Sequence, residues 1–231
     1  MEIYATKISD IIMERMDELC LFISAEKKYK IERFVHKKDK IRALIGELLI
    51  RNIIIEKLGR RNQDIIFDKN LYGKPYLKAY RNFNFNISHS GDFVVCAIDD
   101  KPIGIDIEQV KQMEYMDIAE RFFSPSELAY IEKENPCNEI EKFYEIWTLK
   151  ESYIKCCGEG LSMPLKSFSI NIDEYENVKV VVNKEINKFT LNTMDIDSDY
   201  KMAVCTMNEI ISKEIIIIEQ NNLINNYLEF Y

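Results

Sequence analysis

The chain has 231 residues, 47% of them hydrophobic, and a formal net charge of −8 at neutral pH. This length suits one large domain or two small ones, and the acidic balance excludes indiscriminate nucleic-acid binding as the main activity. The first residues show no basic region followed by an apolar core, and the longest apolar runs are too short to cross a bilayer. We therefore expect a cytoplasmic protein with neither a membrane nor a nucleic-acid partner.

Cysteine and histidine usage narrows the chemistry further. Six cysteines occur without a C-x-x-C pair and beside only two histidines, which argues against a zinc site. Cys156 and Cys157 are adjacent, an awkward geometry for a disulfide, so we expect six reduced thiols. The chain also lacks the G-x-S-x-G motif of many Ser-His-Asp hydrolases.

The first hundred residues predict a strand over residues 1–7 followed by helices. Ser9-Asp10 is expected to cap a helix whose apolar positions are Ile11, Ile12, Met16 and Leu19. A second helix starts at Ser24, and a third runs from Asp39 to about Leu58 and ends at Gly59. The second helix opens a basic cluster of Lys27, Lys28, Lys30, Arg33, Lys37, Lys38 and Lys40. Such a run is either a solvated helix face or a local anion site.

Arg42 lies beside the apolar stripe of the third helix, so its charge needs a partner or a ligand. After a short strand over residues 64–67, Gly73-Lys74-Pro75 forms a stiff turn that does not match a phosphate-binding P-loop. Residues 83–98 then read as a β-hairpin. In its turn, Ser88 and His89 could either donate hydrogen bonds to an anion or satisfy the turn backbone.

The most informative stretch is residues 103–108, Ile-Gly-Ile-Asp-Ile-Glu. Because side chains alternate along a strand, the three isoleucines share one face, and Gly104, Asp106 and Glu108 share the other. Paired carboxylates beside a glycine suit a hard divalent cation such as Mg2+. The alternative is an edge strand with a solvated acidic face.

The second half continues with a helix over residues 113–121 and a helix start at Ser124, where Glu127 is suited to a capping role. A long helix from Glu139 to about Cys157 places Glu151 and Lys155 on one row; they form either a surface ion pair or the wall of a cleft. The remaining residues read as strands near 167–172, 178–182, 189–192, 202–207 and 215–218. The likeliest boundary lies between halves of residues 1–102 and 103–231.

A set of short motifs in this order resembles the surfactin-type (Sfp-type) 4′-phosphopantetheinyl transferases. They are Gly73-Lys74-Pro75, residues 85–90 (Phe-Asn-Ile-Ser-His-Ser), residues 103–108, residues 121–124 (Arg-Phe-Phe-Ser) and the pattern Trp147-x-x-Lys150-Glu151-Ser152-x-x-Lys155. The resemblance implies an α+β fold of two similar halves related by a pseudo-twofold axis, each with antiparallel strands packed on helices, with the donor coenzyme A between them. It also implies a monomer.

The resemblance implies transfer of the phosphopantetheine arm of coenzyme A to a serine of an apo carrier protein, with release of adenosine 3′,5′-bisphosphate. The resemblance does not decide whether the acceptor is a peptide-synthetase, polyketide or fatty-acid carrier. Matched by motif, Asp106, Glu108 and Glu151 resemble the ligands of Mg2+, with Mn2+ as the alternative ion. Glu151, Glu127 and Lys155 resemble catalytic residues, with Glu151 ranked first as the base. The donor-binding residues implied are Lys27, Lys30, Arg42, Lys74, Pro75, Ser88, His89 and Lys155.

One departure is Ala43, where relatives often carry a hydroxyl residue, and it puts nucleotide affinity in doubt. For carrier docking we expect an apolar patch within residues 109–123, unless Phe122 and Phe123 are simply core. Two other functions stay open: a coenzyme A or nucleotide-binding module without catalysis, and a magnesium-dependent phosphohydrolase. Intact acids at Asp106, Glu108 and Glu151 argue against a pure binding module.

Overall fold

A computed structural model describes residues 1–9, 15–133, 135 and 138–229. Its helices are α1 (Met16–Leu19), α2 (Ala25–Glu32), α3 (Lys37–Leu58), α4 (Met116–Phe122), α5 (Pro125–Glu132), α6 (Glu139–Cys157) and α7 (Gln220–Glu229). Its strands are β1 (Glu2–Lys7), β2 (Phe67–Lys69), β3 (Pro75–Leu77), β4 (Asn84–Ser90), β5 (Phe93–Asp99), β6 (Ile103–Gln109), β7 (Phe168–Ile172), β8 (Val178–Val182), β9 (Glu185–Ile186), β10 (Thr190–Met194), β11 (Tyr200–Thr206) and β12 (Ile215–Ile217).

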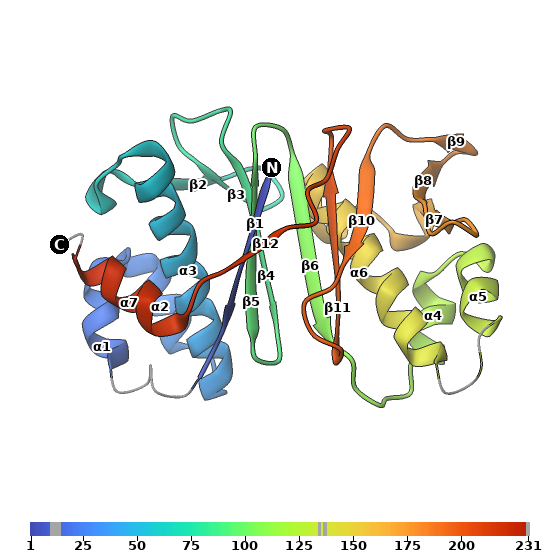
Figure 1. The fold of residues 1–231 in the computed structure, drawn as a ribbon, viewed down its shortest axis with the longest axis horizontal. Coiled ribbons are helices and arrows are strands. Elements are labelled where there is room, and N and C mark those ends of the chain that lie inside the picture. Colours follow the sequence, from blue (N-terminus) through green and yellow to red (C-terminus); the bar gives the residue numbers. More distant parts are fainter. Residues whose placement is uncertain (10–14, 134, 136–137, 230–231) are drawn as a thin grey trace.

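Two sheets form the centre of the molecule, and helices cover their outer sides (Figure 1). The first sheet has the order β12-β1-β5-β4, and the second runs β6-β11-β10-β8-β7 with β9 beside β8. The predicted α+β class is therefore confirmed. The pairings within the second sheet are antiparallel, but β12 pairs with β1 in parallel, through Ile3 opposite Ile215.

The chain returns to its first sheet at its end. β12 lies beside β1, and Leu223, Ile224 and Tyr227 of α7 pack into the apolar cluster that surrounds α3. A division at residue 102 stays a prediction, and under it the final segment would belong structurally with the first unit. The pseudo-twofold relation also stays a prediction.

Helix ends follow the local chemistry of the sequence. Ser24 caps α2 by accepting a hydrogen bond from the backbone N–H of Lys27, and Ser124 and Glu127 form a reciprocal capping box at α5. Gly59 and Gly158 end α3 and α6 in the left-handed conformation, which glycine adopts without steric cost. The expected cap at Ser9-Asp10 and the positions Ile11 and Ile12 fall partly outside the described residues.

The isoleucine face of β6 lies in the core between the two sheets. Ile103, Ile105 and Ile107 are fully buried in a cluster that includes Ile3 of β1, Val95 of β5 and other residues of both sheets. Burying three such side chains contributes about 5–9 kcal/mol before conformational entropy is counted. The predicted alternation is confirmed, and it fixes Asp106 and Glu108 on the opposite face.

Five cysteines within the described residues are free thiols, and Cys137 falls outside that part of the chain. Across the described residues, no helix has both the length and the apolar content that crossing a bilayer requires.

Candidate functional site

The two sheets meet along β4 and β6, and side chains of β4 join them. The Asn86 side-chain oxygen accepts a hydrogen bond from the backbone N–H of Ile105 at 2.8 Å. Ser88 Oγ donates to Asp106 at 2.8 Å, and Ser90 Oγ donates to Glu108 at 2.7 Å. β6 is the edge strand of its sheet, so no strand of that sheet pairs with this side of it. Side chains of β4 satisfy polar groups of β6 there instead.

This seam buries a carboxylate that the edge-strand alternative placed on a solvated face. Asp106 is only 3% exposed, and its Oδ1 also accepts a hydrogen bond from Lys155 Nζ at 2.6 Å. Its Oδ2 is buried and has no hydrogen-bond partner among the described residues. A buried carboxylate oxygen without a partner is costly, so this atom is suited to a ligand that the structure does not include. As the edge-strand alternative expects, β6 lies at the edge of its sheet. Contrary to that alternative, Asp106 is buried rather than solvated.

Glu108 lies one strand repeat further along the seam and is half-buried. Burial raises its pKa; the hydrogen bond from Ser90 opposes that shift, and the negative charge of Asp106 adds to it.

Sequence reasoning missed Asn86 and Ser90, although both lie on the same face of β4 as Ser88. The period-two alternation of residues 86, 88 and 90 was the signal that could have identified them.

Helix α6 brings Glu151 and Lys155 to the same place. Lys155 Nζ donates to Asp106 and, at 3.0 Å, to Ser88 Oγ. Burial raises the pKa of Glu151, and the neighbouring Asp106 raises it further, while Lys155 lowers it. Glu151 thus lies in the electrostatic field of the strand carboxylates, which sequence distance alone would not reveal.

Asp106, Glu108 and Glu151 are close enough to influence one another electrostatically, but they do not form a complete metal-binding site. Over the part of the chain that the structure describes, no three histidine, cysteine or acidic side chains are grouped closely enough to hold a metal ion. Lys155 and the serines of β4 take up oxygens of Asp106 and Glu108 in this arrangement.

Basic groups gather at the turn between β4 and β5. Burial lowers the pKa of His89, and the positive charges of Arg42 and Lys155 lower it further. Arg42 donates to the carbonyl of Gly91 at 2.9 Å and pairs with Asp39, while its buried Nε finds no partner in the described part of the chain. Arg42 and Lys155 therefore place positive charge near His89, which suits an anionic ligand.

Lys27 and Lys30 lie elsewhere than Arg42, although sequence reasoning grouped the three. They line a pocket of about 380 Å3 with Pro75, Phe85 and Ile87, among other residues. Lys27 Nζ lies 3.3 Å from Glu47, and Lys30 pairs with Glu26. This pocket combines ammonium groups, an apolar wall and the carboxylates of Glu26, Glu47 and Asp68.

Lys74 has a structural environment that its motif did not indicate. Its ammonium group donates to the carbonyl oxygens of Ile103 at 2.9 Å and Lys155 at 2.6 Å. The neighbouring Asn70 donates to the carbonyl of Gly158 at 2.7 Å. Burial lowers the pKa of Lys74. The turn thus fastens the C-terminal end of α6 to the start of β6, where a positive charge is favourable.

Glu127 lies apart from the acids of the seam. It is fully buried, and its carboxylate accepts hydrogen bonds from Lys150 at 2.7 and 2.9 Å. The same carboxylate accepts from the backbone N–H groups of Ser124 and Ile170, at 2.6 and 2.7 Å. Its acceptor capacity is therefore taken up by α5, α6 and β7.

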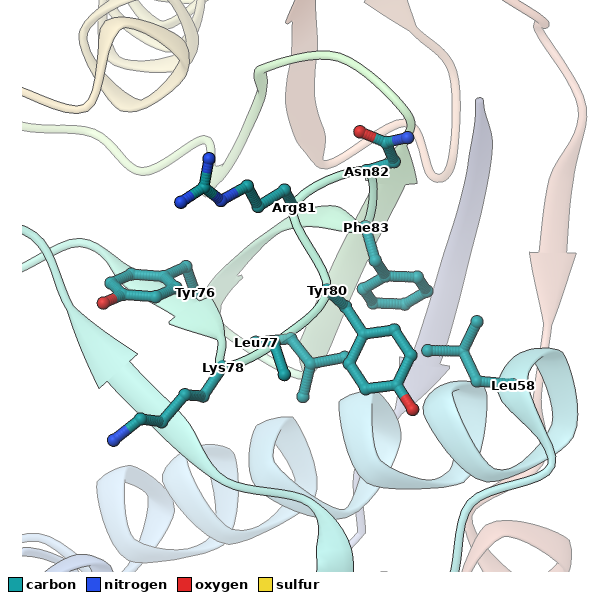
Figure 2. A pocket seen from close by; sticks show the side chains of 9 residues that line it. Leu58, Tyr76, Leu77, Lys78, Tyr80, Arg81, Asn82 and Phe83 are labelled. Atoms are coloured by element: carbon teal, nitrogen blue, oxygen red, sulfur yellow. The ribbon is translucent and has the colours of Figure 1, made fainter.

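A large hollow lies away from the point where these side chains meet. It measures about 710 Å3 and is lined by Leu58 and residues 76–83. Figure 2 shows Lys78 and Arg81 pointing away from each other, with Tyr80 near Leu58 on another side. Polar groups that do not converge make a poor binding site, whatever the volume of the hollow.

Comparison with known proteins gives matches over most of the chain. The profile described as "4′-phosphopantetheinyl transferase superfamily" matches residues 102–205, and "4′-phosphopantetheinyl transferase, N-terminal" matches residues 12–101. A 4′-phosphopantetheinyl transferase of Bacillus subtilis is 42% identical over 205 residues, which cover 86% of this chain and 91% of that protein. The protein Sfp of Bacillus subtilis strain 168 is 37% identical over 211 residues, covering 91% and 94%.

A solved structure of Helicobacter pylori holo-[acyl-carrier-protein] synthase in complex with coenzyme A overlaps 45% of this chain and 97% of that one, with a TM-score of 0.38 at 22% identity.

Proposed function

This chain belongs to the 4′-phosphopantetheinyl transferase superfamily, in its Sfp-type branch, and from that premise we propose a role for each residue of the site. The enzyme transfers the 4′-phosphopantetheine arm of coenzyme A to a serine hydroxyl of an apo carrier protein and releases adenosine 3′,5′-bisphosphate. The observation that carries the residue assignment is the seam of β4, β6 and α6, where Asp106, Glu151 and Lys155 meet.

Asp106, Glu108 and Glu151 would hold Mg2+, or Mn2+ in its place. The unpartnered, buried Oδ2 of Asp106 supports this assignment, and an all-oxygen donor set suits a hard cation. The raised pKa values of Glu108 and Glu151 have the same origin, because these carboxylates are buried near a third acid. When bound, the ion supplies positive charge that neutralises the diphosphate of the donor.

Lys155, Ser88, His89 and Arg42 would bind the phosphates of coenzyme A. Lys155 reaches from α6 to Ser88 at the seam. Arg42 donates to the carbonyl of Gly91 just after β4, and its charge acts on His89 near the end of that strand. These groups orient the diphosphate for attack and stabilise the charge that develops on the leaving group. Lys27, Lys30 and Pro75, which line the 380 Å3 pocket, would receive the nucleotide end.

Glu151 is proposed to accept the proton of the acceptor serine. Because a carboxylate that ligates a cation is itself a poor base, Glu151 would act on a water held beside it. Glu127, the second candidate, is fully occupied by Lys150 and two backbone N–H groups. We propose a structural role for it in anchoring α6, and we likewise assign Lys74 to positioning α6 rather than to contacting the nucleotide.

The acceptors are proposed to be carrier domains of peptide, polyketide or fatty-acid synthases, served by a monomer. Of the apolar patch expected for docking, Met113 is 40% exposed, whereas Phe123 is completely buried. Phe123 packs against Phe143, with ring centroids 5.5 Å apart. The predicted patch therefore loses Phe123 to the core and retains Met113.

The test is to mix the enzyme with coenzyme A, Mg2+ and an apo carrier protein and to weigh the carrier by mass spectrometry. The carrier should gain one phosphopantetheine, and Asp106→Asn should slow that gain at least about a hundredfold. Asp195→Asn, at an exposed position, is the matched control and should leave the rate unchanged. Coenzyme A binding without any gain would favour the non-catalytic module. Release of adenosine 3′,5′-bisphosphate without a carrier would favour a phosphohydrolase.

A further inference from the structure

A buried tyrosine of the second sheet bonds to the turn between β4 and β5, in the first sheet. The hydroxyl group of Tyr200, the first residue of β11, accepts a hydrogen bond from the backbone N–H of Asp92 at 2.9 Å. Tyr200 is only 7% exposed, so its hydroxyl group needs a partner within the protein. In Figure 1 this turn and the start of β11 lie at the same lower edge of the molecule. The bond therefore joins the two sheets at that edge.

The hydroxyl group and the ring of Tyr200 make different contacts. A Cβ on Gly91 would lie 2.3 Å from the hydroxyl oxygen, so this close approach depends on a residue without a side chain. The ring packs edge-on against Phe93, with centroids 4.9 Å apart, in the apolar cluster between the sheets. Phenylalanine in place of Tyr200 would therefore keep the core contact and remove only the bond to the turn.

Other contacts hold the same turn from the side of α3. Arg42 donates to the carbonyl of Gly91 at 2.9 Å, and Lys38 Nζ lies 2.8 Å from the carboxylate of Asp92. These contacts place the turn relative to the first sheet and its helix. The bond to Tyr200 places the turn relative to β11 and, because β11 pairs with β6, relative to β6 as well.

The turn follows directly after the serine that contacts a proposed metal ligand. Ser90 Oγ donates to Glu108 at 2.7 Å and accepts a hydrogen bond from the backbone N–H of Gln109 at 3.0 Å. Tyr200 is the cross-strand partner of Gln109 in the pairing of β11 with β6. The position of the turn relative to β6 therefore decides whether Ser90 reaches Glu108 and orients its carboxylate.

We propose that Tyr200 is a positioning residue of the transfer site: its hydroxyl group fixes the β4–β5 turn, and the turn holds Ser90 against Glu108. This inference rests on the proposed function and adds a residue that acts on a proposed metal ligand through two intermediate contacts. Hydrogen-bond partners of metal ligands commonly contribute tenfold or more to metal affinity, because they fix the orientation of the ligand. A hydroxyl group that merely stabilised the fold would leave the Mg2+ requirement unchanged.

The test compares Tyr200→Phe with Tyr153→Phe, which is the matched control. Tyr153 is 3% exposed, its ring packs against Phe168 with centroids 4.6 Å apart, and its hydroxyl group accepts a hydrogen bond from Asn187 at 3.1 Å. Each variant thus loses one hydroxyl group from a buried ring, and only one of them changes the β4–β5 turn. Both should lower the Tm by a similar amount, about 2–4 °C.

The first readout is backbone amide exchange, followed by NMR without metal or coenzyme A. In Tyr200→Phe the amides of Asp92 and Gln109 should exchange about tenfold faster than in the wild type. Asp92 loses its acceptor directly, and Gln109 loses its acceptor because Ser90 moves away. Ser90→Ala should accelerate exchange at Gln109 but not at Asp92, which gives the order of the contacts.

The second readout is the Mg2+ concentration that gives half the maximal rate of holo-carrier formation, with apo acyl carrier protein as the acceptor. We expect it to rise about tenfold in Tyr200→Phe and to stay at the wild-type value in Tyr153→Phe, with KM for the carrier unchanged in both. The double variant Tyr200→Phe/Ser90→Ala should need no more Mg2+ than Ser90→Ala alone, because both changes break the same chain of contacts.

Unchanged exchange at Asp92 or Gln109 in Tyr200→Phe would overturn the proposal. So would a Mg2+ requirement that stays at the wild-type value in Tyr200→Phe, or that rises equally in Tyr153→Phe. Additive effects in the double variant would overturn the route through Ser90. If the wild type transfers nothing, the proposed function fails, and the exchange measurements without metal still decide whether Tyr200 positions Ser90.

Discussion

Replacing Gly104 by alanine should separate the two elements that form the site. A Cβ at this position would lie 2.0 Å from the carbonyl oxygen of Ser152 and 2.4 Å from the amide nitrogen of Cys156. Both are backbone atoms of α6, so no side-chain rotation can relieve the contact. Restoring an approach of about 3 Å moves α6 away from β6 by about 1 Å, and overpacking of this kind costs about 3 kcal/mol.

The displaced helix carries Glu151 and Lys155, which flank the two points of contact. Misplacing reacting groups by about 1 Å can lower the rate about a hundredfold. Gly104→Ala should therefore lose about 3 kcal/mol in the free energy of unfolding and most of its transfer rate together. The assays are urea denaturation followed by circular dichroism and the rate of holo-carrier formation by mass spectrometry.

Gly46→Ala is the matched control, at a buried glycine of α3. Its Cβ would meet side-chain atoms, Ile87 Cγ2 at 3.3 Å and Val94 Cγ1 at 3.7 Å, which can shift. Alanine is favoured over glycine in a helix interior by about 1 kcal/mol, which offsets the tighter packing. If Gly104→Ala unfolds at the same urea concentration as the wild type and keeps its full rate, the close approach of α6 to β6 is not what positions the site.

Three further predictions concern single side chains. Lys74→Met should lower the free energy of unfolding by about 2–4 kcal/mol in urea titrations, because the carbonyls of Ile103 and Lys155 lose their donor; an equal loss in exposed Lys78→Met would contradict this. Glu127→Gln should cost about 3–5 kcal/mol, since Lys150 keeps a buried charge without its carboxylate, whereas Glu132→Gln on the same helix should be neutral. Burial raises the pKa of Glu151, so its contribution to the metal-free fold is most favourable below the ordinary glutamate pKa and is lost as pH rises through the raised value. Glu151→Gln should therefore raise the Tm at pH 8 without divalent cations but not at pH 4, while abolishing transfer; a Tm below that of the wild type at pH 8 would refute the assigned burial.

The sequence by itself determined the elements and the chemistry they carry. The alternation of residues 103–108 predicted β6 and its two faces, and the capping residues Ser24, Ser124 and Gly59 marked helix ends that the structure confirms. These features depend on neighbours within a few residues, so local periodicity and backbone preference encode them. The prediction of a strand over residues 64–67 was wrong by about one strand length, because β2 begins only at Phe67. The short elements β3, β9 and α7 were not predicted.

The tertiary structure alone decided which of these elements meet. β12 and α7 return to the first sheet, Lys74 fastens the end of α6 to β6, and Glu127 is enclosed by Lys150 rather than directed to the seam. The seam itself pairs β4 with β6 through side chains, and α6 closes on Gly104 from about fifty residues further along the chain. Contacts between residues so distant in sequence depend on how the apolar faces of whole helices and sheets pack and exclude water. The sequence pattern of one segment does not specify which other segment it packs against.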